Sequence, residues 1–271
     1  MMTAMTRRIF VDLNTQNDFC TSYGEHSLGD TSAREFRNMG YLVNFALSER
    51  TMILGSVETN PYDSWKFYTS SKKGPLGAKG THKPYCVKGE LGWNKLANTL
   101  VERRAFLPDL PVSKELRNKF VYSGSLQALY LEKEGESGIF SNVNSLDVLS
   151  DLVAKPMIEM ANKTEDLEFV VFGVVLEKDV LNTCMFLKEW YKDTIELYLG
   201  KDREGKLIIK VVEDAVEAAR LGQKEGVFNE LKENGIELVT TYDVTGNEHA
   251  KDTQTKKQSS KGTPPPASNL E

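Results

Sequence analysis

The chain has 271 residues, with 40% hydrophobic residues, 27% charged residues and a formal net charge of -5. This composition is typical of an ordinary soluble protein, and its acidic balance gives no electrostatic reason to expect nucleic acid or an anionic membrane as a partner. No stretch approaches the ~20 consecutive apolar residues of a membrane span, so we expect no membrane partner.

The cysteines and the N-terminal residues bear on the compartment. Cys20, Cys86 and Cys184 are odd in number and lack metal-type spacing, so they predict neither a disulfide framework nor a zinc site. The opening MMTAMTRR leads into a strand without the apolar segment of a secretory signal. We therefore expect a protein of a reducing compartment, the cytoplasm.

Residues 246–271 differ in composition from the rest of the chain. They include almost no large apolar residue and contain a triple proline near their end, so they cannot bury enough apolar surface to fold. We predict a disordered polar tail there. Residues 1–245 are predicted to form one domain, because a single α/β sheet can organise a chain of that length.

The first half of the chain predicts two strands, two helices and a long irregular excursion. Residues 8–13 read as a short apolar strand, a helix opens near Thr31, and residues 51–57 read as a second strand. Residues 58–92 are rich in Gly, Pro, Ser and Lys. So long a segment without regular structure is uncommon unless it builds a site. A helix is predicted over 93–104.

The second half alternates short apolar runs with helical patterns. The apolar runs cover residues 119–123, 128–133, 169–175, 207–212 and 236–240, and a helix is predicted over 145–160. Strands that alternate with helices imply right-handed crossovers and a parallel sheet. We therefore predict an α/β fold with three αβα layers and a doubly wound, mainly parallel sheet of about six strands.

The junction between the central strand and the next helix is the first candidate site. Residues 169–175 are continuously apolar and β-branched, as in a strand covered on both faces. Asp179 follows near the first helical turn. Open α/β sheets bind ligands at this edge, and a helix amino end stabilises negative charge. The alternative is that Asp179 only caps the helix.

Five fragments of the chain resemble, in the right order, motifs of the isochorismatase-like hydrolases, a family that includes nicotinamidases and related cysteine amidases. VDLNTQNDFC resembles the opening motif V-D-x-Q-N-D-F with two residues inserted after Leu13, and PYCVKGELGWNKL resembles P-H-C-V-x-G-T-x-G-x-x-L. The surroundings of Lys133, the segment GVVLEKDVLNT at 173–183 and VEDA at 212–215 resemble three later motifs. The resemblance covers most of the folded part and implies a hydrolase of a small molecule.

The resemblance implies three catalytic roles. Asp12 matches the catalytic acid/base, and Lys133 matches the cation that holds this acid ionised and stabilises the transition state. Asp179 stands in the position of the cysteine nucleophile, which in the family is made more acidic by its neighbours and the helix dipole. We expect the three side chains to lie in one pocket, within the ~4–6 Å over which charges shift each other's pKa.

The resemblance also implies positions for binding. Phe19, Val175 and Leu176 match substrate-binding or oxyanion positions. The family carries a cis peptide that falls here between Val174 and Val175, and we expect it to turn backbone N–H groups toward the oxyanion.

The metal set that nicotinamidases carry after the second strand matches Glu58, Asn60 and Ser64 in this chain. The imidazoles are missing, and one carboxylate with an amide and a hydroxyl is a poor transition-metal site. We therefore expect no metal and no cofactor, with these three residues as weak metal candidates.

Three classes of function remain open, and the sequence favours the first. It is a small-molecule hydrolase that uses water or an aspartate in place of a thiolate, with two carboxylates sharing a proton around one lysine. The second is a thiol amidase, which requires Cys184 or Cys86 to reach the site. The third is a catalytically silent relative that binds a small molecule or a partner protein. A homo-oligomer is also open, because relatives often assemble.

Overall fold

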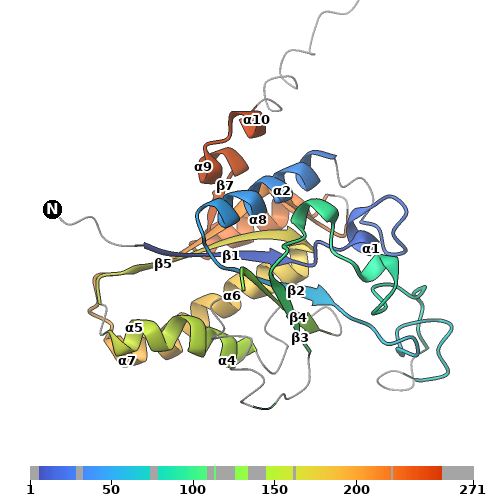
Figure 1. The fold of residues 1–271 in the computed structure, drawn as a ribbon, viewed down its shortest axis with the longest axis horizontal. Coiled ribbons are helices and arrows are strands. Elements are labelled where there is room, and N and C mark those ends of the chain that lie inside the picture. The colour runs from blue at the N-terminus through green and yellow to red at the C-terminus, as the bar shows by residue number, and fades with distance from the viewer. Residues whose placement is uncertain are drawn as a thin grey trace, which may run out of the picture.

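The centre of the molecule is a parallel sheet. The computed structural model describes residues 6–28, 33–73, 79–108, 113, 126–133, 145–160, 163–220 and 222–251. Seven strands pair in the order β3-β4-β2-β1-β5-β6-β7, and every pairing is parallel (Figure 1). The strands are β1 (Thr6–Leu13), β2 (Ile53–Glu58), β3 (Arg104–Leu107), β4 (Ala128–Lys133), β5 (Asp166–Val174), β6 (Leu207–Glu217) and β7 (Glu237–Val239). The predicted α/β class is confirmed, with one strand more than predicted.

Helices cover both faces of this sheet. The helices are α1 (Asn17–Cys20), α2 (Ala33–Ser48), α4 (Ser145–Leu149), α5 (Lys155–Glu159), α6 (Leu181–Trp190), α7 (Leu197–Leu199), α8 (Lys224–Glu233), α9 (Thr241–Thr245) and α10 (Glu248–Lys251). α2 and α9 pack together on one face, and Figure 1 shows α4 and α5 beyond the opposite face. A π-helical stretch, Ser150–Ala154, joins α4 to α5, so the predicted helix over 145–160 is nearly continuous.

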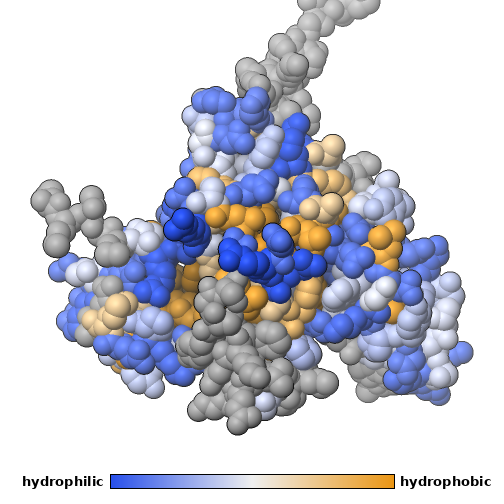
Figure 2. Space-filling view, in the orientation of Figure 1, coloured by the Kyte–Doolittle hydropathy of each residue, from blue (hydrophilic) through white to orange (hydrophobic). Residues whose placement is uncertain are grey.

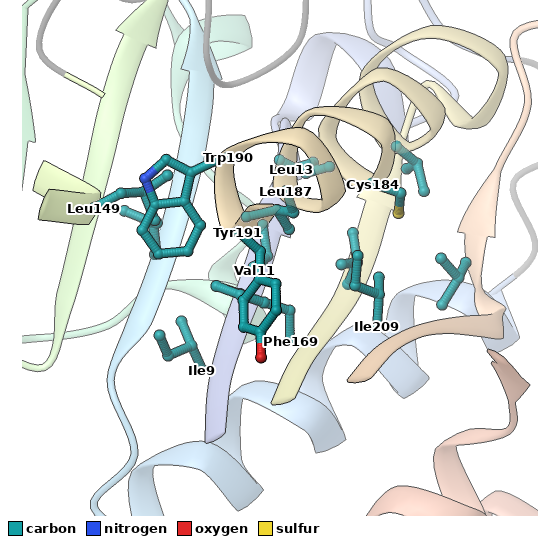
Figure 3. Close-up of a cluster of buried hydrophobic side chains, with 14 of the residues drawn as sticks. Ile9, Val11, Leu13, Leu149, Phe169, Cys184, Leu187, Trp190, Tyr191 and Ile209 are labelled. Atoms are coloured by element: carbon teal, nitrogen blue, oxygen red, sulfur yellow. The ribbon is translucent and has the colours of Figure 1, made fainter. Parts of the chain in front are cut away.

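Each face of the sheet has its own hydrophobic cluster, because side chains alternate along a strand. In β1, Phe10 packs toward α2, whereas Val11 and Leu13 pack toward α6. Figure 3 shows the α6 cluster, with Val11 beneath Leu187. On the surface, apolar side chains gather toward the centre of the face in Figure 2 and hydrophilic ones surround them.

The segment after the excursion differs from the prediction. Residues 93–104 do not form a helix: two short 3₁₀ turns, Leu91–Trp93 and Ala97–Thr99, are followed by β3. The stretch between the turns is extended, because Lys95 forms an antiparallel bridge with Gln16 and Leu96 N–H donates to the Thr15 carbonyl at 2.8 Å. Pairing with the end of β1 therefore overrides the helical pattern.

Some predicted elements fall outside the described residues. These include the apolar run 119–123, the helix opening at Thr31 and residues 252–271 of the predicted tail. Glu248–Lys251, at the start of that tail, form the short helix α10. In the described ranges, no helix has the length and apolar character needed to cross a lipid bilayer.

Candidate functional site

The carboxyl ends of β4 and β5 bring a lysine and an aspartate together. Lys133 is the last residue of β4, and Asp179 lies in the π-helical turn Leu176–Val180 that follows β5. Lys133 Nζ is 2.7 Å from Asp179 Oδ1, and both side chains are buried. We call this contact the Lys133–Asp179 pair. Its charges interact strongly because little water screens them.

Asn14 is the third side chain at this pair. Its Nδ2 donates to Asp179 Oδ2 at 2.9 Å, and its Oδ1 accepts from the Ser56 hydroxyl at 2.8 Å. Asn14 has a φ of 50°, a left-handed conformation that asparagine tolerates better than most residues. At this turn the side chains no longer alternate between the two faces of the sheet as they do along β1. The two oxygens of Asp179 are therefore held by an ammonium and an amide from different strand ends.

Asp12 lies in a second polar cluster. Its carboxylate is 2.9 Å from Lys95 Nζ and accepts from the Thr15 hydroxyl at 2.8 Å and the Tyr130 hydroxyl at 3.2 Å. Lys95 Nζ also lies 4.2 Å from the Tyr130 ring centroid and 2.6 Å from Thr15 Oγ1. We call this contact the Asp12–Lys95 pair. The structure thus brings Lys133 and Asp179 together and places Asp12 with a different lysine.

The register of the sheet explains this separation. Asp12 is level with Gly55, which is level with Tyr130 in β4, whereas Lys133 is level with Glu58 three rows further along. Three rows correspond to about 10 Å along the strands, and an odd number of rows puts the side chain on the opposite face. Asp12 therefore faces the α2 side, and Lys133 faces the α6 side.

The two lysines respond differently to burial. Burial alone disfavours the Lys133 ammonium, but the nearby Asp179 and Glu58 carboxylates outweigh it and raise the pKa of Lys133 above its usual value. For Lys95, burial prevails over the attraction of Asp12, and its pKa is lowered. Burial, followed by Asp12, raises the pKa of Tyr130. Lys133 is therefore the more firmly charged of the two lysines.

The peptide bond expected to orient the oxyanion N–H groups differs from the prediction. Every described peptide bond is trans, including the one between Val174 and Val175, so the expected cis peptide is wrong. The N–H groups of Lys178, Asp179 and Val180 all donate to the Val175 carbonyl, at 3.2, 2.9 and 3.3 Å. They therefore close the first helical turn.

The other residues predicted to bind substrate are buried. Leu176 packs in the α6 cluster, and Val175 is 8% exposed. Phe19 packs on the α2 side with its ring edge against Tyr85, 5.9 Å between centroids. Phe19 and Leu176 therefore lie in different hydrophobic clusters.

The three thiols are buried. Burial raises the pKa of Cys20, Cys86 and Cys184 well above that of an exposed thiol. Figure 3 shows Cys184 among aliphatic side chains near Leu187. Because the thiolate is the nucleophilic form, this environment does not suit a thiol amidase.

The weak metal candidates Glu58, Asn60 and Ser64 are all buried. Lys66 reaches into this group: its Nζ is 3.3 Å from Glu58 Oε1 and 3.1 Å from Asn60 Oδ1. Burial would raise the pKa of Glu58, but Lys133, Lys66 and the Asn60 amide lower it overall. An ammonium already contacts the oxygens that a metal ion would need, so these residues do not fit a transition metal.

The sequence reasoning missed Asn14, Lys95 and Lys66. A signal for Asn14 does exist: counted back from Gln16-Asn17-Asp18-Phe19, the motif V-D-x-Q-N-D-F places its acid at residue 14 and not at Asp12. Lys95 and Lys66 have no comparable signal, because each is a single lysine in a segment without a strand or helix pattern, and the motifs assign it no role.

The comparisons with known proteins concern the fold. No model of a protein family and no curated protein matches the sequence. Among solved structures, the nicotinamidase/pyrazinamidase of Bacillus subtilis is similar over 86% of this chain and 100% of its own, with 14% identity and a TM-score of 0.53. An isochorismatase family protein from Desulfovibrio vulgaris is similar over 89% and 100%, with 17% identity and a TM-score of 0.55. A pyrazinamidase of Pyrococcus horikoshii in complex with zinc is similar over 86% and 99%, with 14% identity and a TM-score of 0.52.

Proposed function

We propose that this chain, which has the isochorismatase-like fold, binds a small molecule at the carboxyl edge of its sheet without the thiol chemistry of the cysteine amidases. The observation that carries the proposal is the Lys133–Asp179 pair with Asn14 beside it. It supports the catalytically silent alternative over the thiol-independent hydrolase that the sequence alone favours.

The geometry of the pair explains this preference. A nucleophile needs an adjacent base or a depressed pKa, and a free approach to the substrate. Here Lys133 and Asn14 donate to different oxygens of Asp179. The residue beside the nucleophile position is an amide, which does not accept a proton at neutral pH. Lys133 and Asn14 therefore stabilise the Asp179 carboxylate, and none of the three side chains acts as a general base toward another.

A second candidate is the aspartate-dependent hydrolase, with Asp12 as acid/base, Lys133 as stabiliser and Asp179 in the nucleophile position. One observation favours it. Asp179 lies 2.7 Å from an ammonium whose pKa is raised, and a water-activating base needs the negative charge that such an ammonium maintains.

The test is to restore the family's residues one at a time. Wild type, Asn14→Asp, Asp179→Cys and the Asn14→Asp/Asp179→Cys double variant are assayed against amides, including nicotinamide, and vinyl ethers. We expect no turnover by wild type or either single variant. Amidase activity is expected in the double variant, because only there do an acid and a thiol flank Lys133.

Turnover by wild type would reverse the order of the two candidates. In that case Asp179→Asn abolishes the activity and alkylation of the three cysteines leaves it intact. Asp12→Asn should abolish the activity as well, because this candidate gives Asp12 the acid/base role. The matched control is Lys72→Ala, which removes an exposed lysine paired with Asp63.

A further inference from the structure

The excursion after β2 contains a cation of its own. The side chain of Lys66 is 13% exposed. Its ammonium contacts Asn60 and also Glu58, which is the last residue of β2. Asn60 in turn donates to Glu58 Oε1 and to the Tyr85 carbonyl, both at 3.1 Å. This cluster of Glu58, Asn60 and Lys66 is therefore held together by reciprocal contacts.

The ammonium occupies the place where a metal ion would have to bind. Lys66 Nζ contacts Glu58 Oε1 and Asn60 Oδ1, one oxygen from each of two candidate ligands. A divalent ion bound to those oxygens would meet a positive charge within a few ångström. Because an interior site screens charge less than water does, this repulsion disfavours the binding of a metal ion.

We infer that Lys66 is the resident cation of this cluster and takes the place of a divalent metal ion. The inference concerns only which cation lies at Glu58 and Asn60, and it holds whether or not the chain turns over a substrate. It also explains the donor set: an amide and a carboxylate are good acceptors for an ammonium, whereas transition metals prefer imidazoles and thiolates.

Binding of Mg²⁺, an ion that carboxylate and amide oxygens suit, to the full-length chain tests the inference, measured by isothermal titration and by the shift in melting temperature. Wild type and Lys66→Arg, which keeps the charge, should show no stoichiometric site at Glu58. Lys66→Ala should bind Mg²⁺ about tenfold more tightly or better, because the competing charge is gone. Adding Glu58→Gln to Lys66→Ala should remove that gain. The control is Lys72→Ala, which removes an exposed lysine paired with Asp63 and should behave as wild type.

Two results would overturn the inference. One is a wild-type Mg²⁺ site of one equivalent that Glu58→Gln weakens. The other is a folded Lys66→Ala variant whose affinity for Mg²⁺ equals that of wild type. If Lys66→Ala does not fold, Lys66→Met is measured in its place, since it keeps the length of the side chain without the charge.

Discussion

The molecule buries two lysine–aspartate pairs on opposite faces of one sheet, and they differ in what surrounds the lysine. Lys133 lies near two carboxylates, Asp179 and Glu58, and its pKa is raised. Lys95 faces Asp12, and its pKa is lowered. The two lysines are almost equally inaccessible, at 0% and 4% exposure. The charge of a buried lysine is therefore set here by its carboxylate neighbours and not by its depth.

The pairs also differ in what they connect. The Asp12–Lys95 pair connects residues 91–99, the segment after the excursion, to β1. It lies next to the bridge between Gln16 and Lys95. The Lys133–Asp179 pair joins the ends of β4 and β5 at the edge where parallel α/β sheets bind ligands. We assign the first a structural role and the second the candidate site.

Removal of Lys133 should have the largest effect. Lys133→Met leaves two buried carboxylates without their shared ammonium, and we expect the free energy of unfolding to fall by about 3–5 kcal/mol. Lys95→Met should cost less, because burial already disfavours that charge. Urea unfolding of both variants at neutral pH measures the difference, and equal losses would contradict the comparison.

Asn14→Asp should have the next largest effect. It places a second carboxylate against Asp179, and we expect a loss of about 1–3 kcal/mol at neutral pH. Two adjacent carboxylates share a proton, so one pKa is raised in the folded state and the loss should shrink as the pH falls. Asn14→Ala removes the hydrogen bond without adding charge, and its loss should not depend on pH in this way. Unfolding curves across the acid range distinguish the two variants.

Glu58→Gln should change the pH dependence of stability. The pKa of Glu58 is lowered from 4.5 in the folded chain. Its contribution to stability is therefore present above that value and is lost as the pH falls through the folded pKa. The free energy of unfolding of wild type should fall with acidification more steeply than that of Glu58→Gln. Parallel slopes below pH 4.5 would contradict the role of Lys66 and Lys133.

Replacement of the whole Asp12–Lys95 pair should have the smallest effect. A buried ion pair can often be exchanged for apolar residues of similar volume at little cost. Asp12→Leu/Lys95→Met/Tyr130→Phe, which also removes the hydroxyl that donates to Asp12, should therefore stay within about 1 kcal/mol of wild type, since Thr15 keeps its 3.0 Å contact with Thr99. Either Asp12→Leu or Lys95→Met alone should destabilise the chain far more. Urea unfolding of the three variants tests this non-additivity.

The sequence predicts the sheet well because its strands are long apolar runs that need no tertiary information. The contact between Lys133, at the end of β4, and Asp179, just after β5, follows from the same reasoning, since both lie at strand ends on one edge of the sheet. β3 was missed, and residues 93–104 were predicted as a helix, because their conformation depends on a bridge to Gln16 almost 80 residues earlier.

The position of Asp12 could not be predicted from motif matching alone. Which face it occupies depends on the register between β1, β2 and β4, and a shift of one residue reverses the face. Asn14 contacts Asp179 from a backbone conformation with positive φ. Asparagine can adopt this conformation, but its presence in the sequence does not predict it. The motif match therefore selects Asp12, whereas the side chain that contacts Asp179 is Asn14, two residues further along the chain.

The strand order has a consequence for synthesis. β1 pairs with β2 on one side and with β5 on the other, although β5 (Asp166–Val174) follows it by more than half of the chain. At ~5–20 residues per second, β5 leaves the ribosome roughly 10–30 seconds after β1. During that interval one edge of β1, with the apolar residues Ile9, Phe10 and Val11, has no partner strand. That edge of the nascent chain is therefore open to pairing with another chain until β5 emerges.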